Sequence, residues 1–195
     1  MNKYILIFVE GETEVEFYQN YIIPHIKSLI PCDTSCWKVI NVKGIGGFKV
    51  DAIQKFKKIY SDNSDYDFYV ILCYDTDVFE YASGQPIEWD SVEKRIKNID
   101  NKKQIIVKRI EANKCIEDWI LHDLEGICKW LKIRTPKKIT GKNGYEKLKK
   151  LFNDNDKVYV KGKKVEGLLT HIDVKKIIKK LEKELDVFYK IFDIK

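Results

Sequence analysis

Hydrophobic and polar positions along the chain follow two alternating patterns. Residues 4–9 are almost all apolar and β-prone, which is typical of a strand buried on both faces of a parallel sheet. After this run, apolar residues recur at helical spacing from Val15 to Ile26, and the pattern breaks near Pro31. The first part of the chain is therefore predicted to be a strand followed by a helix.

The same order of a strand and then a helix repeats further along the chain. Strands that alternate with helices are joined by right-handed crossovers, so the sequence predicts an α/β fold. We expect an open, mostly parallel sheet with helices on both faces. Further strands are expected at residues 37–42, 66–77 and 104–110, and further helices at residues 50–60, 91–99 and 119–131.

The composition changes near residue 132, where Lys, Gly, Asn and Asp become frequent. We therefore expect a first domain at residues 1–131 and a basic, mainly helical C-terminal extension at residues 132–195 that packs on it. An apolar stripe from Val174 to Phe192 predicts the last helix, packed on the core or on a second copy of the chain. The extension is also expected to contain a helix at residues 145–152 and a small hairpin at residues 157–169.

The charge of the chain is distributed unevenly. With 195 residues, 44% of them hydrophobic and 34% charged, the chain has the composition of a globular protein. Residues 132–164 hold twelve Lys and Arg against three acidic residues, a charge of +9, so the remainder carries −3. A basic segment favours a polyanion such as DNA or RNA as partner, with a lysine-rich surface of no specific role as the alternative. The candidate nucleic-acid contacts are Lys137, Lys138, Lys142, Lys161 and Lys163.

The cysteines and the first residues of the chain indicate the cellular compartment in which we expect the protein. Five cysteines without the spacing of a zinc site or a disulfide framework are expected to be reduced thiols of a cytoplasmic protein. The apolar run before Glu10 is too short for a signal sequence or a membrane span. We expect no membrane partner, and the oligomeric state is left open.

Candidate chemistry is found where the predicted strands end. Glu10 ends the first strand, and Asp75 and Asp77 end the third. In an open α/β sheet the carboxyl ends of the strands share one edge, and ligands bind outside that edge. Clustered carboxylates repel one another unless a cation neutralises them, and Mg²⁺ prefers such oxygen ligands. Any one of these acids alone could instead cap a helix or form a turn.

The sequences around these acids resemble a known family. "VEGETE" after the first strand and "LCYDTD" after the third are similar to the two acidic motifs of the TOPRIM domain, over about residues 3–130. TOPRIM proteins include nucleases, primases, topoisomerases and recombination proteins. The resemblance implies that Glu10, Asp75 and Asp77 are catalytic and hold Mg²⁺, for which Mn²⁺ can substitute.

Two further acids follow from the same resemblance. "VEGETEVEFY" is most similar to the nuclease branch, the overcoming-lysogenization-defect (OLD) and RloB-like proteins, in which a second glutamate follows four residues on. Here that residue is Glu14, with its neighbours Glu12 and Glu16 as alternatives. "EANKCIEDWILHD" resembles a stretch of RloB-like proteins and selects Glu117 as a further metal ligand. Glu111 and Asp118 are the alternatives there.

The resemblance implies a function. We expect a Mg²⁺-dependent nuclease that hydrolyses phosphodiester bonds of DNA or RNA, tRNA included, and that serves prokaryotic defence against phage. Lys161 or Lys163 could steady the charge that builds up on the phosphate. OLD proteins join their TOPRIM domain to an ATPase, and this sequence has no Walker A motif, so an ATPase partner would be a separate chain. The alternatives are a non-catalytic nucleic-acid-binding subunit of an ATPase-containing complex and a TOPRIM ribonuclease that matures RNA.

Overall fold

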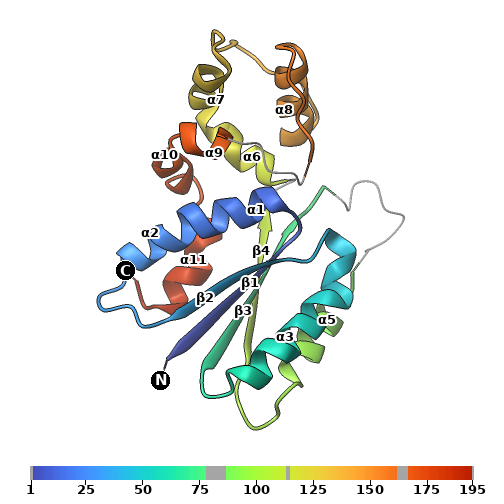
Figure 1. The fold of residues 1–195 in the computed structure, drawn as a ribbon, viewed down its shortest axis with the longest axis vertical. Coiled ribbons are helices and arrows are strands. Elements are labelled where there is room, and N and C mark those ends of the chain that lie inside the picture. Colours follow the sequence, from blue (N-terminus) through green and yellow to red (C-terminus); the bar gives the residue numbers. More distant parts are fainter. Residues whose placement is uncertain (1, 78–86, 113–114, 162–166, 195) are drawn as a thin grey trace.

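A four-stranded sheet lies at the centre of the protein (Figure 1). The computed structural model describes residues 2–77, 87–112, 115–161 and 167–194. All strand pairs are parallel, which confirms the α/β fold with a parallel sheet. The strands are β1 (Lys3–Val9), β2 (Cys36–Asn41), β3 (Asp67–Asp75) and β4 (Ile106–Ala112).

The order of the strands across the sheet is β2-β1-β3-β4. β1 lies between two neighbours and is covered on both faces, which explains why its sequence is almost entirely apolar. The register places Val9 beside Asn41, and Asp75 beside Ala112. The carboxyl ends of all the strands therefore meet at one edge of the sheet.

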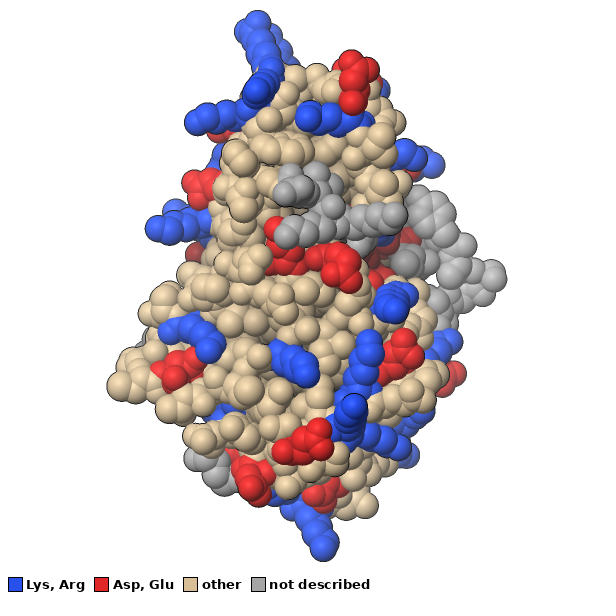
Figure 2. Space-filling model, viewed as in Figure 1, with Lys and Arg blue, Asp and Glu red and all other residues tan. Residues whose placement is uncertain are grey.

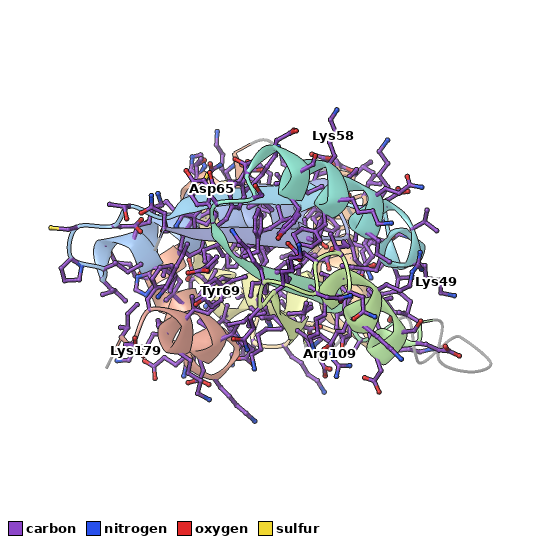
Figure 3. All side chains as sticks on the ribbon, turned by 90° about the horizontal axis from the view of Figure 1, so that it is seen from below. Lys49, Lys58, Asp65, Tyr69, Arg109 and Lys179 are labelled. Carbon is purple, nitrogen blue, oxygen red and sulfur yellow. The ribbon has the colours of Figure 1, made fainter. Side chains whose placement is uncertain are left out.

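Helices cover both faces of the sheet (Figure 1). Along β1 alternate side chains point to opposite faces, so Ile7 and Phe8 belong to two different hydrophobic clusters. Figure 3 shows the two layers from below, with Lys58 on one outer side and Lys179 on the other. The first face carries α1 (Glu12–Phe17), η1 (Tyr18–Ile22), α2 (Ile23–Ser28) and α11 (Glu182–Ile191), and the second carries η2 (Ile45–Lys49), α3 (Asp51–Asp62) and α5 (Trp89–Lys97).

A group of short helices stands over the carboxyl edge of the sheet, and we call it the helical cap (Figure 1). Its buried residues Ile127, Leu148 and Leu168 belong to the same hydrophobic cluster as Ile7 of β1, so the cap and the sheet share a core. No helix in the described part of the chain combines the length and the apolar character needed to span a membrane. The cap consists of α6 (Ile116–Ile120), η3 (Leu121–Asp123), α7 (Leu124–Leu131), α8 (Gly144–Asn153), α9 (Leu168–His171) and α10 (Val174–Ile178).

The hairpin predicted at residues 157–169 is wrong where the structure describes this segment. Residues 157–161 form no strand, and α9 follows later in the segment. The alternation that suggested a strand reflects exposure instead, because Val158 and Val160 face solvent while Tyr159 between them is buried. Residues 157–161 therefore pair with no strand in the described part of the chain.

The predicted helices are interrupted more often than their apolar patterns indicate. The first helix is continuous from α1 to α2, but its middle turn, η1, is a π-helix. The last helix is split into α10 and α11 by a turn at residues 179–181. Ile178, Leu181 and Leu185 are nevertheless buried in one cluster, so a single apolar stripe continues across the break.

Asp123 holds two parts of the helical cap together. Its buried carboxylate accepts hydrogen bonds from the backbone N–H of Asp173 at 2.7 Å and from Lys176 Nζ at 3.1 Å. Asp173 in turn caps α10 by accepting a hydrogen bond from the N–H of Lys176. Burial alone would raise the pKa of Asp123, but these donors outweigh it and hold the pKa below its ordinary value.

We expect Asp123→Asn to lower the unfolding temperature near pH 7 by about 3–5 °C, because the charge-assisted hydrogen bonds are lost. A carboxylate whose pKa is lower in the folded than in the unfolded state stabilises the protein above the unfolded pKa. That contribution is lost as the pH falls through the folded pKa. The difference in unfolding temperature between wild type and variant should therefore shrink as the pH falls below 3.8, the ordinary pKa of an aspartate, as followed by circular dichroism during heating.

Glu125→Gln is the matched control for this prediction. Glu125 is the second carboxylate partner of Lys176, at 3.4 Å, and its side chain is 78% exposed. An exposed ion pair contributes little, so we expect the control to shift the unfolding temperature by less than about 1 °C. Equal shifts in the two variants would contradict the role of burial at Asp123.

Candidate functional site

A cavity of about 400 Å³ lies at the carboxyl edge of the sheet, where the strands meet the helical cap. We call it the acidic cavity, because Glu10, Glu14, Asp75 and Glu117 line it together with Lys161. Figure 2 shows acidic side chains grouped between the sheet layer and the cap, with Lys and Arg spread over the rest of that face. The structure thus brings together acids that the sequence separates widely.

Two strand ends fix the first pair of acids. Glu10 directly follows β1, and its Oε1 accepts a hydrogen bond from the backbone N–H of Asp75 at 2.8 Å. Asp75 is the last residue of β3, and its Oδ1 accepts from the N–H of Ile116 at 3.0 Å. The N–H of Gly44, a residue with a φ of 96°, donates to the Glu10 carbonyl at 2.8 Å. Backbone N–H groups of β3 and α6 therefore orient the two carboxylates, and the Gly44 contact holds the backbone of Glu10.

Glu14 and Glu117 reach the cavity from the first turns of α1 and α6. Glu14 is 8% exposed and Glu117 is fully buried. In each of them Oε2 is buried and has no hydrogen-bond partner. A buried carboxylate oxygen without a donor is costly, so both side chains have a free acceptor available for a ligand.

The neighbours of these two glutamates have other partners. Glu12 is exposed, and its Oε1 accepts from Asn41 Nδ2 at 2.6 Å. Glu16 is buried but does not line the acidic cavity. Glu111 is exposed and accepts a hydrogen bond from the hydroxyl of Tyr74.

Lys161 joins the remaining acids. Its Nζ lies 3.1 Å from Asp75 Oδ2 and 2.6 Å from Asp77 Oδ2, so one ammonium group bridges the last residue of β3 and an aspartate in the turn after it. Asn143 donates from Nδ2 to the same oxygen of Asp77 at 3.3 Å, whereas Asp77 Oδ1 is buried without a partner. Lys161 and Asn143 both belong to the segment that was predicted as a basic extension.

Burial dominates the electrostatics of the acidic cavity. It raises the pKa of Glu10 and that of Glu14 to about 7 each. Burial and the charge of Glu14 also raise the pKa of Asp75 well above its ordinary value. For Lys161 burial would lower the pKa, but Asp75 and Asp77 outweigh it and raise the pKa. The acids thus carry an unfavourable concentration of negative charge that a cation offsets.

The donor set suits a hard divalent cation. Mg²⁺ and Mn²⁺ prefer carboxylate oxygens, and Glu14, Asp77 and Glu117 each have a free buried oxygen. No group of three or more Asp, Glu, His or Cys side chains among the described residues is, however, arranged to hold a metal ion. Two of the acids, Asp75 and Asp77, pair with the Lys161 ammonium instead.

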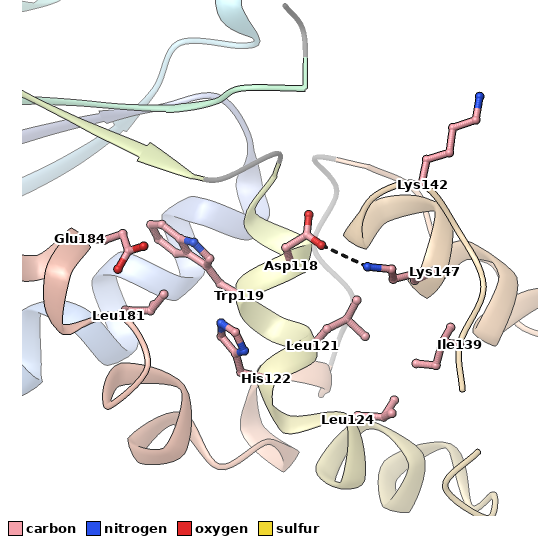
Figure 4. A pocket seen from close by; sticks show the side chains of 10 residues that line it. All are labelled: Asp118, Trp119, Leu121, His122, Leu124, Ile139, Lys142, Lys147, Leu181 and Glu184. Carbon is pink, nitrogen blue, oxygen red and sulfur yellow. Dashed lines mark ion pairs between the residues drawn. The ribbon is translucent and has the colours of Figure 1, made fainter. Parts of the chain in front are cut away.

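Asp118, the neighbour of Glu117, faces a different cavity. A hollow of about 580 Å³ lies on the other side of α6, and Figure 4 shows Asp118 and Lys147, which both line it, pointing toward each other. Asp118 Oδ1 lies 3.6 Å from Lys147 Nζ. Successive residues of α6 therefore point to opposite sides, and Glu117 alone of this pair reaches the acidic cavity.

The predicted lysine contacts are dispersed. Lys137 and Lys138 are exposed in the connection between α7 and α8. Lys142 is exposed beside the hollow on the other side of α6. Lys161 lies in the acidic cavity, and Lys163 lies outside the described residues. Lys161 contacts two of the clustered acids, Asp75 and Asp77.

The close approach of α8 to α6 depends on Gly144. A Cβ atom at this position would lie 2.2 Å from the backbone N of Asp118 and 2.5 Å from the carbonyl C of Glu117. Because neither helix can absorb such a clash locally, we expect Gly144→Ala to lower the free energy of unfolding by about 2 kcal/mol. Urea denaturation measures the change.

Gly46→Ala is the matched control for Gly144→Ala. A Cβ atom on Gly46 would meet nothing within 4 Å. The control should therefore change the free energy of unfolding by less than about 1 kcal/mol, with a gain as the expected direction. Similar losses in both variants would contradict tight packing at Gly144.

Two residues of the site have no signal in the sequence that assigns them to it. Tyr159 donates its hydroxyl to Glu117 Oε1 at 3.0 Å, and both residues are buried. Asn143 precedes a glycine and a helical pattern, which marks it as a helix cap, and it does accept from the N–H of Glu146. Its second contact, with Asp77, depends on how the cap folds over the sheet.

The chemistry of the acidic cavity follows from the burial, the charges and the contacts of its own side chains. The free cysteines of the chain do not contribute a thiolate ligand there, since Cys115 is fully buried and burial raises the pKa of its thiol.

Comparison of the chain with models of protein families, with curated proteins and with solved structures finds no match.

Proposed function

We propose that this protein is a Mg²⁺-dependent nuclease of TOPRIM type that hydrolyses phosphodiester bonds of DNA or RNA. The observation that supports the proposal is the meeting of Glu10, Asp75 and Asp77 at the carboxyl edge of a parallel sheet, with Glu14 and Glu117 beside them. Such an edge is where open α/β sheets bind their ligands. Clustered carboxylates with free oxygens are suited to holding a cation next to a phosphate.

In this proposal each residue has a defined task. Glu10, Glu14, Asp75, Asp77 and Glu117 hold the cation, which when bound would polarise a phosphate oxygen and lower the pKa of a bound water. Lys161 donates from its ammonium group to the negative charge that develops on the phosphate. The exposed lysines at 137, 138 and 142 would contact the backbone of the nucleic acid.

The setting that we propose is prokaryotic defence against phage, in the cytoplasm. This part of the proposal depends on the resemblance of "VEGETEVEFY" to OLD and RloB-like proteins. That all five cysteines are free is compatible with a reducing compartment.

One observation favours a second candidate, a non-catalytic nucleic-acid-binding subunit. Lys161 already neutralises Asp75 and Asp77, and no metal-binding arrangement exists among the described residues. An acidic cluster held together by a lysine could be a structural feature. In that case neutralising an acid would leave nucleic-acid binding unchanged and remove no activity.

A cleavage assay tests the proposed function. Purified protein is incubated with single- and double-stranded DNA, RNA and tRNA, each with Mg²⁺, with Mn²⁺ and with EDTA. We expect cutting of at least one substrate with a divalent ion and none with EDTA. Binding of Mn²⁺ is measured in parallel by electron paramagnetic resonance, because the signal of free Mn²⁺ falls when the ion binds. Absence of both cutting and Mn²⁺ binding would refute the proposal, whereas binding of nucleic acid without either would support the second candidate.

A further inference from the structure

Tyr159 is buried in the short segment at residues 157–161, which follows α8. It is 2% exposed, although the valines on either side of it face solvent. Its ring packs against Phe152 at 5.3 Å and Tyr145 at 6.2 Å between ring centroids. The ring therefore packs on α8, while the hydroxyl points towards Glu117 of α6.

The hydroxyl of Tyr159 meets the most buried acid of the site. It donates to Glu117 Oε1 at 3.0 Å, and Glu117 is fully buried. The carboxylate is thereby fixed through one oxygen, while Glu117 Oε2 has no partner. Because Glu117 lines the acidic cavity with Glu10, Glu14 and Asp75, the free oxygen belongs to a group that faces the other acids.

The same division between a fixed and a free oxygen occurs at Asp77. Its Oδ2 is held by Asn143 and Lys161, and its Oδ1 is free. Metal-binding carboxylates are typically oriented in this way by hydrogen bonds from outside the coordination shell, and loss of such a partner costs about 10–100-fold in metal affinity or activity. A tyrosine that only filled space would need no hydroxyl here.

We propose that Tyr159 is a positioning residue that orients Glu117 for binding a divalent cation in the acidic cavity. This inference rests on the proposed function, since it requires that Glu117 be a ligand. Tyr159 acts through Glu117 and contacts neither the cation nor the substrate. The segment after α8 thus belongs to the site although it carries none of the acidic motifs.

Mn²⁺ titration of Tyr159→Phe tests this proposal. Phenylalanine keeps the ring packing and removes only the hydroxyl, so we expect the dissociation constant of Mn²⁺, measured by electron paramagnetic resonance, to rise about tenfold. Tyr145→Phe is the matched control, because its ring packs on Tyr159 and contacts no carboxylate of the cavity. This control should bind Mn²⁺ as the wild type does.

A double-mutant cycle with Glu117→Gln separates positioning from packing. If Tyr159 acts through Glu117, removal of its hydroxyl in the Glu117→Gln background should change the Mn²⁺ dissociation constant by less than about twofold. Additive effects of the two substitutions would overturn the inference, and so would an unchanged dissociation constant in Tyr159→Phe. Failure of the wild type itself to bind Mn²⁺ would overturn the proposed function as well, so the two failures are distinguishable.

Discussion

Replacing Asp75 by Asn is expected to lower metal-dependent cleavage about a thousandfold while nucleic-acid binding persists. Asp75 is 3% exposed, and its Oδ1 is already used by the N–H of Ile116. Asparagine can keep that acceptor, but it replaces the other oxygen by an N–H₂ group that faces the Lys161 ammonium. The variant therefore loses a negative charge at the centre of the cavity with little change of shape. Glu10→Gln should behave in the same way, since its amide oxygen can still accept from the N–H of Asp75.

Stability distinguishes a lost activity from a lost fold in these variants. Neutralising Glu10 removes part of the repulsion among the acids and keeps the acceptor for the N–H of Asp75, so metal-free Glu10→Gln should unfold at or above the wild-type temperature. Glu12→Gln is the matched control, because Glu12 lies on α1 near the same acids but is exposed and bonded to Asn41. It should retain cleavage within about threefold. Cleavage by Asp75→Asn within about tenfold of wild type would contradict the nuclease assignment.

Replacing Lys161 by Met is expected to destabilise the metal-free protein by about 2 kcal/mol. Removing one partner of a buried ion pair leaves an uncompensated charge, and the partly exposed ammonium makes the loss smaller than for a fully buried pair. A divalent cation that binds the freed acids would stabilise the folded state. Added Mn²⁺ should therefore reduce the difference in the free energy of unfolding between Lys161→Met and wild type. Urea denaturation with and without Mn²⁺ measures both effects. Cleavage should also fall about a hundredfold, because the phosphate loses its donor.

Lys147→Met provides the comparison for Lys161→Met. The two lysine side chains are similarly exposed, at 32% and 35%, and each pairs with an aspartate. The partner of Lys147 is Asp118, which lies outside the acidic cavity. Lys147→Met should therefore lower the free energy of unfolding by less than about 1 kcal/mol, and Mn²⁺ should not change this difference. If Mn²⁺ leaves the Lys161→Met difference unchanged, the acids around it do not take up a cation.

The strand ends could be predicted from the sequence because parallel strands are recognisable one at a time. The apolar runs that end at Glu10 and Asp75 indicate buried strands, and the rule that their carboxyl ends share an edge brings the two acids together. Glu14 and Glu117 needed the resemblance to a family, because an acid in the first turn of a helix is ordinary. Their location in the cavity depends on tertiary packing.

The contacts of Tyr159 and Asn143 with the acids could not be predicted from the sequence in the same way. Tyr159 lies between two exposed valines, and this alternation is also that of a strand with one buried face. Only the packing of α8 against α6, which Gly144 permits, brings Tyr159 and Asn143 to the acids. Local patterns carry no information about that approach. The break between α10 and α11 could not be predicted for a related reason, since the apolar stripe continues through the turn.

The residues of the site are far apart in the sequence, and this affects the order in which the site assembles during translation. Glu10 and Asp75 are 65 positions apart, and Asp77 and Lys161 are 84 apart. Contacts between such distant segments form late, and a chain emerging from the ribosome presents its N-terminal part first. In a nascent chain, Glu10 and Asp75 are thus synthesised before Tyr159 and Lys161. At that stage α11 is not yet present to cover its face of the sheet. For the proposed nuclease, this order of assembly delays the completed site until Lys161 has been synthesised.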